Sequence, residues 1–260
     1  MPLFATFCAK VVIFCRISAC FPEEKRKFVT LKHRKRIMDR KNIVVSDELR
    51  RVWPRFVGGA VMATFINNAY SEGLWQEIHE CEEFLRARYT TESIKSIAAI
   101  EATRLAYKAC GKEPSRYRPS SEQLVRRILQ GKSLYQIDTC VDLVNLASMR
   151  SGYSIGGFDA DRIDGDTLTL GIGREGEPYE GIGRGVLNIA GMPVYRDATG
   201  GIGTPTSDHE RTKLSMETTT LLALVNGYDG DAEAVRHCCD DLVTLLCRYA
   251  SASDSLVWMY

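Results

Sequence analysis

The densest group of reactive side chains lies in the segment GGIGTPTSDHERTK, at 200–213. Ser207, Asp208 and His209 are the three residue types of a hydrolytic triad. A triad forms by convergence in space, however, and adjacent residues do not face one another. We therefore expect a binding loop in which Arg211 meets a phosphate or a carboxylate. His209 could act as a base or hold a surface hydrogen bond.

A second motif with possible chemistry is a G-x-G-x-x-G at Gly171, Gly173 and Gly176. It would bind a dinucleotide if a helix began at its last glycine. The following residues, EPYEGIGRG, contain a proline and three more glycines, and each interior glycine costs a helix about 1 kcal/mol relative to alanine. The pattern therefore predicts turns in a β-rich region, and we expect no cofactor.

The cysteines do not indicate a metal site or a disulfide framework. There are nine of them, an odd number, without any C-x-x-C spacing. In the segment HCCD at 237–240, neighbouring residues of a helix would point about 100° apart and could not close on one ion. The cysteine pattern favours a reducing cytoplasm.

Hydrophobic periodicity shows which elements must position these residues. It predicts helices at 71–89, 92–111, 119–131, 138–152 and 231–250. Strands are expected at 56–68 and 218–227, with short strands and turns at about 153–197. Ser120 and Gln123 have the spacing of a capping box for the third helix. Helices that precede a β-rich half, followed by one strand and one helix, indicate an α+β fold.

The charge distribution separates an N-terminal segment from the rest. Residues 1–37 contain nine Lys/Arg and two Glu, which leaves 25 basic and 31 acidic residues beyond position 37 and a net charge of about −6 there. We expect 1–37 to be a disordered basic extension, a targeting segment or a region outside the natural chain, and 38–255 to be one domain. The apolar run in 1–37 is too short to cross a bilayer, and we expect no membrane contact.

One local basic stripe could contact nucleic acid. It comprises Arg116, Arg118, Arg126, Arg127 and Lys132, with Tyr117 among them. Such a stripe fits either a solvated helix face or a surface for RNA phosphates. An acidic body otherwise argues against general polyanion binding, and we expect no DNA partner.

The segment LYQIDTCVDLVNLASMRSGYSIGGFDADRIDGDTLTL resembles the tRNA-binding and editing domain of the phenylalanyl-tRNA synthetase β-subunit, in its stand-alone form. The SDHERTK loop and the TTTLLALV strand extend the resemblance to roughly 42–250. It implies an α+β fold with a β-barrel-like mixed sheet core, decorated by N-terminal helices and a C-terminal helix. It also implies a pocket near the VN helix, the GG turn and the later glycine-rich loop.

The resemblance implies hydrolysis of a mischarged aminoacyl-tRNA ester in trans, with tRNA as the partner. Positioned water and backbone N–H groups at glycine-rich bends could suffice for an ester that is already reactive. The substrate-binding residues expected from it are Asn145, Gly156, Gly157, Gly200, Gly201, Ser207, Asp208 and Arg211. The candidates for catalysis are Asn145, His209 and Thr212.

Three positions depart from the synthetase pattern. Val144 stands where that form has threonine, Gly156 where it has histidine, and Leu224 where it has the glutamate that reads a tyrosine hydroxyl. Two alternatives therefore stay open. The chain could be a non-catalytic RNA- or amino-acid-binding module, or an unrelated hydrolase on the same fold.

Overall fold

The computed structural model of the chain describes residues 38–260, so the extension expected at 1–37 lies outside the described residues. Ten strands form within the described part: β1 (Asn42–Val45), β2 (Val57–Thr64), β3 (Ile155–Asp159), β4 (Thr167–Ile172), β5 (Glu180–Gly181), β6 (Gly185–Val186), β7 (Pro193–Arg196), β8 (Gly201–Gly203), β9 (Thr220–Gly227) and β10 (Asp254–Met259). The α-helices there are α1 (Asp47–Val52), α2 (Glu72–Arg88), α3 (Ala98–Ala109), α4 (Ser120–Leu129), α5 (Thr139–Ser151) and α6 (Ala232–Tyr249).

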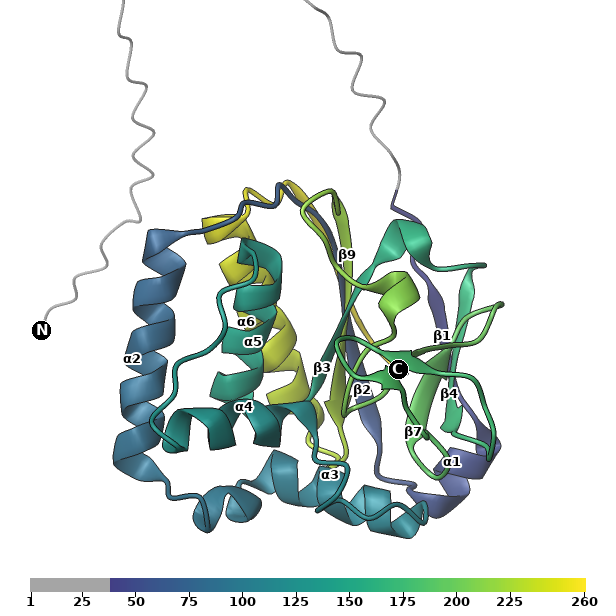
Figure 1. The fold of residues 1–260 in the computed structure, drawn as a ribbon. Coiled ribbons are helices and arrows are strands. Elements are labelled where there is room, and N and C mark those ends of the chain that lie inside the picture. The colour runs from purple at the N-terminus through teal and green to yellow at the C-terminus, as the bar shows by residue number, and fades with distance from the viewer. Residues whose placement is uncertain (1–37) are drawn as a thin grey trace, which may run out of the picture. The chain divides into compact units, whose positions relative to one another are not determined.

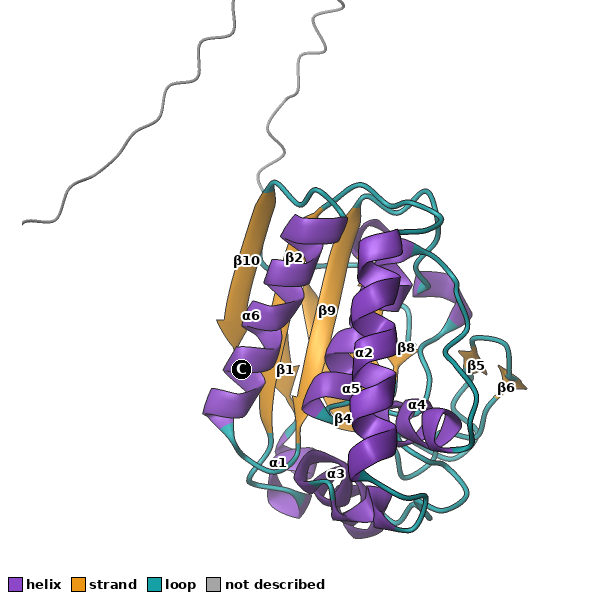
Figure 2. Cartoon of the chain, turned by 90° about the vertical axis from the view of Figure 1, so that its left-hand side faces the viewer, coloured by secondary structure: helices purple, strands orange, loops and turns teal. Residues whose placement is uncertain are grey.

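These elements form three layers, as Figure 1 shows for the domain that begins at Met38. The central layer is an antiparallel sheet of order β10-β2-β9-β3. Helices α5 and α6 pack on one face of it and α2 packs against α5, which Figure 2 shows from the helix side. A second sheet, β1-β4-β7-β8, packs against the other face. The α+β class is confirmed, and the expected β-barrel-like core consists of two open sheets.

Strand β9 explains how one apolar run serves both layers, because all of its residues are buried. Side chains alternate along a strand. Leu221, Ala223 and Val225 therefore join the core under the helices, whereas Leu222 and Leu224 join the core between the two sheets. This double burial produces the nearly continuous hydrophobic run that the sequence shows at 218–227.

Four of the five predicted helices are confirmed to within two residues, and one is wrong. The segment 92–111 is a 3-10 turn at Ser93–Ser96 followed by α3, with Ile97 in an extended conformation between them. Hydroxyl groups compete here with the backbone: Ser93 Oγ accepts from the amide of Thr90 at 2.8 Å, and Ser96 Oγ donates to the carbonyl of Ser93. Local bonds of this kind favour turns over a continuous helix.

The capping box predicted for α4 is also wrong. Pro119 occupies the N-cap position, so Ser120 is already helical and its amide donates to the carbonyl of Pro205 at 2.7 Å. The side chain of Gln123 instead donates to the carbonyls of Arg118 and Thr206. The start of α4 is therefore stabilised by contacts with the 204–206 segment.

The G-x-G-x-x-G motif forms no helix, as predicted. Gly171 lies in β4, and Gly176 has a positive φ of 70° in the turn that follows. A Cβ at Gly173 would lie 2.0 Å from the carbonyl oxygen of Ile189, so a close approach of two backbones requires glycine there. The later glycines form the β5–β6 hairpin.

Within residues 38–260, no helix is both long and apolar enough to span a membrane. The same residues contain no group of three His, Cys, Asp or Glu side chains that could hold a metal ion. Cys238 and Cys239 are buried in α6 and belong to the core under the helices, as expected for small apolar residues.

Candidate functional site

A cavity of about 550 Å³ lies between α5, the edge strand β3 and the segment 204–208. Its walls are mainly apolar, through the side chains of Leu124, Ile137, Val141, Val144, Ile155, Ile182 and Leu214. A few polar groups face the same space, among them those of Asn145, Ser148, Ser207, Asp208, Arg184 and Lys213. A concave apolar site with a small number of polar groups is typical of a ligand pocket.

Helix α5 contributes one complete face to the cavity. Val141, Val144, Asn145 and Ser148 all line it, and their spacing of three and four residues puts them on one side of a helix. Asp138 fixes the start of the helix, because its carboxylate accepts from the amide of Val141 at 2.9 Å. The side-chain amide of Asn145 forms no hydrogen bond within residues 38–260, so it is free to meet a ligand.

The opposite wall is built where the SDHERTK segment covers the edge of β3. The amide of Gly157 donates to Oδ2 of Asp208 at 3.0 Å, and Phe158 and Lys213 form a β-bridge nearby. Burial raises the pKa of Asp208 to about 7, although the Gly157 hydrogen bond acts in the opposite direction. No Lys or Arg among the described residues forms an ion pair with this carboxylate. An unpaired acid of this kind in a cavity is a candidate for acid–base chemistry.

The expected glycine-rich cleft is filled by a phenylalanine. A Cβ at Gly156 would lie 2.6 Å from Cζ of Phe158, and one at Gly203 would lie 2.4 Å from the same atom. These two glycines therefore make room for the Phe158 ring between the sheets. Because neighbours on a strand face opposite sides, Gly157 lines the cavity and Gly156 does not.

The other predicted glycines also lie outside the residues that line the cavity. A Cβ at Gly201 would lie 2.9 Å from the Tyr179 ring. The amide of Gly200 donates to Oδ1 of Asp197 at 3.1 Å. The backbone N–H groups of Gly157 and Gly200 are thus bound to carboxylates of the chain itself.

His209, Arg211 and Thr212 do not line the cavity. Arg211 forms two hydrogen bonds with Asp197, at 2.9 and 2.8 Å. The ring of His209 packs edge-on against Tyr179, its Nδ1 accepts from the amide of Arg211, and burial lowers its pKa. The buried hydroxyl of Thr212 forms no hydrogen bond within the described part of the chain. Among the residues predicted from the sequence, the structure brings together Asn145, Gly157, Ser207 and Asp208.

Sequence reasoning missed the contribution of the β5–β6 hairpin, because its glycines were expected to be plain turns. Ile182 and Arg184, at the tip of the hairpin, both line the cavity. A β-bridge between Gly181 and His209 joins the hairpin to the SDHERTK segment. The signal in the sequence is that two large side chains, the apolar Ile182 and the cationic Arg184, alternate with glycines.

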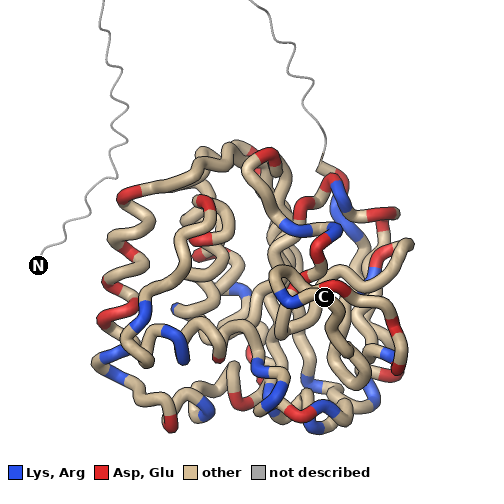
Figure 3. The backbone as a smooth tube through the Cα atoms, viewed as in Figure 1, with Lys and Arg blue, Asp and Glu red and all other residues tan. Residues whose placement is uncertain are grey.

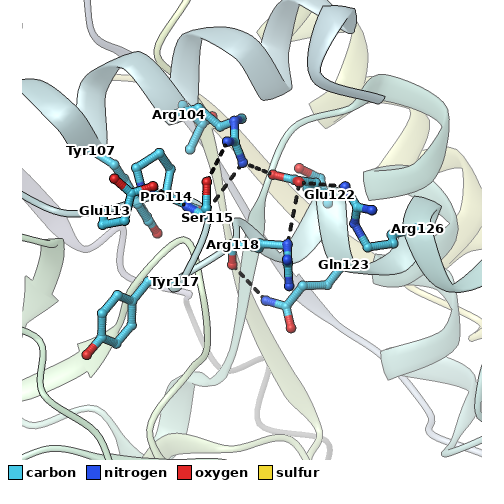
Figure 4. A network of polar contacts seen from close by, with 12 residues as sticks. Arg104, Tyr107, Glu113, Pro114, Ser115, Tyr117, Arg118, Glu122, Gln123 and Arg126 are labelled. Atoms are coloured by element: carbon cyan, nitrogen blue, oxygen red, sulfur yellow. Dashed lines mark hydrogen bonds and ion pairs between the residues drawn. The ribbon is translucent and has the colours of Figure 1, made fainter. Parts of the chain in front are cut away.

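The basic stripe at 112–132 is partly neutralised by one buried acid. Glu122 is 1% exposed and pairs with Arg104 at 2.7 Å, Arg126 at 3.3 Å and Arg118 at 3.8 Å, as Figure 4 shows. Over the domain, acidic and basic residues are interspersed (Figure 3). Two members of the stripe are therefore engaged in structure, although the side chain of Arg118 is still 45% exposed.

The remaining members of the stripe have no acidic partner among the described residues. Arg127 lies over the ring of Tyr135, 3.6 Å from its centroid, and donates to the carbonyl of Ser133. Arg116 lies over Tyr117, and Lys132 is exposed. These cations are available to solvent on the surface beside α4.

Comparisons with solved structures and with protein families both found similar proteins. The chain is similar to an N-terminal fragment of the phenylalanyl-tRNA synthetase β-subunit from Pyrococcus horikoshii, with 14% identity and a TM-score of 0.43. The similarity covers 84% of this chain and 51% of that fragment, so the chain spans about half of its length. No curated protein matches the chain. The sequence profile of the B3/4 domain matches residues 102–251, which are more than half of the chain and include every residue that lines the cavity; the chain belongs to the B3/4 domain family.

Proposed function

We propose that this chain hydrolyses the ester of a mischarged aminoacyl-tRNA in trans. The observation that carries the proposal is Asp208, a carboxylate with a pKa of about 7 that lines a mainly apolar cavity. A general base is most effective when its pKa lies near the working pH. Lys213, a cation of the same cavity, is paired with Glu210 at 2.5 Å and leaves Asp208 uncompensated.

The reaction requires no covalent intermediate. The ionised Asp208 takes a proton from a water molecule, and the oxygen of that water attacks the ester carbonyl carbon. The bond between this carbon and the ribose oxygen then breaks, and the ribose oxygen receives the proton. The hydrogen bond from Gly157 orients the carboxylate throughout. Orientation alone lowers the barrier for an ester that is already reactive.

Asn145 supplies the polar contact opposite Asp208. Its free amide group can donate to the carbonyl oxygen as negative charge develops there, which is where hydrogen bonds accelerate acyl transfer most. The aminoacyl side chain then lies against Val141, Val144 and Leu214. Leu224 belongs to the core between the sheets, away from the cavity. Because the walls that meet the aminoacyl side chain are mainly apolar, we favour an apolar amino acid over tyrosine as the group that is removed.

The tRNA would approach across the surface beside α4. Ser120 and Gln123 of this helix line the cavity, and the basic stripe lies in the same helix and in the loops on either side of it. We propose that Arg116, Arg127 and Lys132 contact phosphates most directly, while Arg118 and Arg126 also hold Glu122. Under this proposal the domain that begins at Met38 acts in the cytoplasm, where charged tRNA is used.

The test is release of labelled amino acid from a panel of mischarged tRNAs. The panel should include tRNAs that carry aliphatic amino acids and one that carries tyrosine, each measured against the rate in buffer. We expect release above the buffer rate for at least one aliphatic ester. Release from none of them would contradict the proposal, and tight tRNA binding without turnover would favour a non-catalytic binding module.

A further inference from the structure

The tip of the β5–β6 hairpin forms one lip of the cavity. Gly183 and Gly185 both have a φ of 65°, a conformation that favours glycine, and they place Arg184 between them. Two hydrogen bonds tie the hairpin to the opposite wall: the amide of Ile182 donates to the carbonyl of Asp208 at 3.0 Å, and that of Gly183 donates to Glu210. The hairpin tip that carries Arg184 is therefore held against the SDHERTK segment.

Arg184 is oriented by a neutral side chain across the mouth of the cavity. Its Nη2 donates to Oε1 of Gln123. The amide nitrogen of Gln123 donates to the carbonyl of Arg118 at 2.7 Å and to that of Thr206 at 3.3 Å. These two bonds determine which end of the amide faces Arg184. Gln123 thus positions the guanidinium without neutralising its charge.

Arg184 differs from Arg118, Arg126 and Arg211 because its charge is not paired with an acidic residue. Arg118 and Arg126 share Glu122, and Arg211 is paired with Asp197. Arg184 is exposed, lines the cavity, and forms no ion pair with any acidic residue in the described part of the chain. Most of its five N–H donors are therefore free for a ligand.

We infer that Arg184 binds an anionic oxygen of a phosphodiester at the mouth of the cavity, with Gln123 as its positioning residue. The inference rests on the proposed function for the identity of the ligand. The apolar interior takes the acyl group, so the nucleic acid chain must leave through the mouth, where the guanidinium lies. Arginine suits such a contact, because its planar fork matches phosphate oxygens.

Binding of the trinucleotide CCA tests this inference, because the probe has phosphodiesters and no acyl group. Calorimetry on the full chain should compare the wild type with Arg184→Gln, Arg184→Lys and the control Arg88→Gln. The Arg88 side chain does not line the cavity, lies over Phe84 and likewise has no acidic partner among the described residues. We expect Arg184→Gln to weaken binding about tenfold, as for one charge-assisted hydrogen bond. The salt dependence should fall by about 0.7 in slope. The lysine variant should keep part of the affinity, and the Arg88 variant nearly all of it.

The role of Gln123 is tested by a double-mutant cycle. Gln123→Ala should weaken CCA binding in the wild type and have no further effect in the Arg184→Gln background, which a merely structural role would not produce. Absence of CCA binding by the wild type, or equal losses for the Arg184 and Arg88 variants, would overturn the inference. Deacylation that is unaffected by Arg184→Gln would do so while leaving the proposed function intact. CCA binding that depends on Arg184 without any deacylation would refute only hydrolysis.

Discussion

Two carboxylates in neighbouring loops, Asp197 and Asp208, have opposite surroundings. Asp197 receives two hydrogen bonds from Arg211 and others from the amides of Asp164, Thr199 and Gly200. Although burial raises its pKa, these bonds outweigh burial, and the pKa is lower than usual. Asp208 receives one amide bond, from Gly157, and its pKa rises to about 7.

The difference distinguishes a structural acid from a reactive one. A carboxylate that is fully paired stays ionised and holds its loop in place, whereas an unpaired one in an apolar cavity can exchange a proton near neutral pH. The cations follow the same division, since Arg211 is paired and Arg184 is not. Asp208 and Arg184 line the cavity, whereas Asp197 and Arg211 do not.

The strongest test of this comparison is Asp208→Asn. The amide cannot accept a proton from water, so we expect deacylation to fall by about 10³-fold, within the usual range for a general base. In the wild type the rate should rise with pH and level off above about pH 7, because the base must be ionised. Single-turnover rates from pH 5 to 9 measure both effects.

Asp197→Asn is the matched control, because it makes the same chemical change outside the cavity. Its deacylation rate should stay within a few-fold of the wild type wherever the variant is folded. Equal losses in the two variants would mean that the distinction between the two acids has no catalytic meaning.

The next effect concerns stability and tests Asp197, the structural acid of the comparison. Arg211→Ala leaves the buried carboxylate of Asp197 without its cation, and we expect a loss of about 2 to 3 kcal/mol in the free energy of unfolding. The value is below that of a fully buried pair because the side chain of Arg211 is 28% exposed. Urea unfolding of the full chain measures it. An unchanged midpoint would show that the pair does not hold the loop, and Arg211 could then be reconsidered as a ligand-binding residue.

Sequence reasoning located α2, α4, α5 and α6 and the α+β class, but it did not predict the two packed open sheets. Periodicity located the helices that line or cover the cavity, and the resemblance pointed to Asn145 and to the SDHERTK segment. The sequence alone could not show that Gly156 and Gly157 face opposite sides of the sheet, because this depends on the register of β3. Nor could it show that Phe158 fills the space beside Gly203, because this is a packing relation between distant segments.

The arginines illustrate the same limit. Arg184, Arg211 and Arg118 are equivalent as letters in the sequence, and only the structure shows which of them have acidic partners. Arg211 was expected to meet a ligand, and it is bound by Asp197. Ion pairs between residues far apart in the chain cannot be inferred from local patterns, so charge compensation is the information that the fold adds.

The smallest effect expected is a pH-dependent gain in stability in Asp208→Asn. The pKa of Asp208 is about 7 in the folded protein, and an aspartate in an unfolded chain has a pKa of about 3.9. Between these values the folded state binds more protons than the unfolded state, so this group lowers wild-type stability as pH rises, and the cost is complete above pH 7. Asparagine has no such cost. The stability gained by the variant over the wild type, measured as the free energy of unfolding, should therefore be about 2 kcal/mol larger at pH 8 than at pH 5. The value is less than the full shift implies because the side chain borders the cavity.

Asp197→Asn, whose wild-type carboxylate is ionised at both pH values, should show the same difference from the wild type at each. A constant difference for Asp208→Asn as well would show that its pKa is not raised, and would remove the basis for calling it a base.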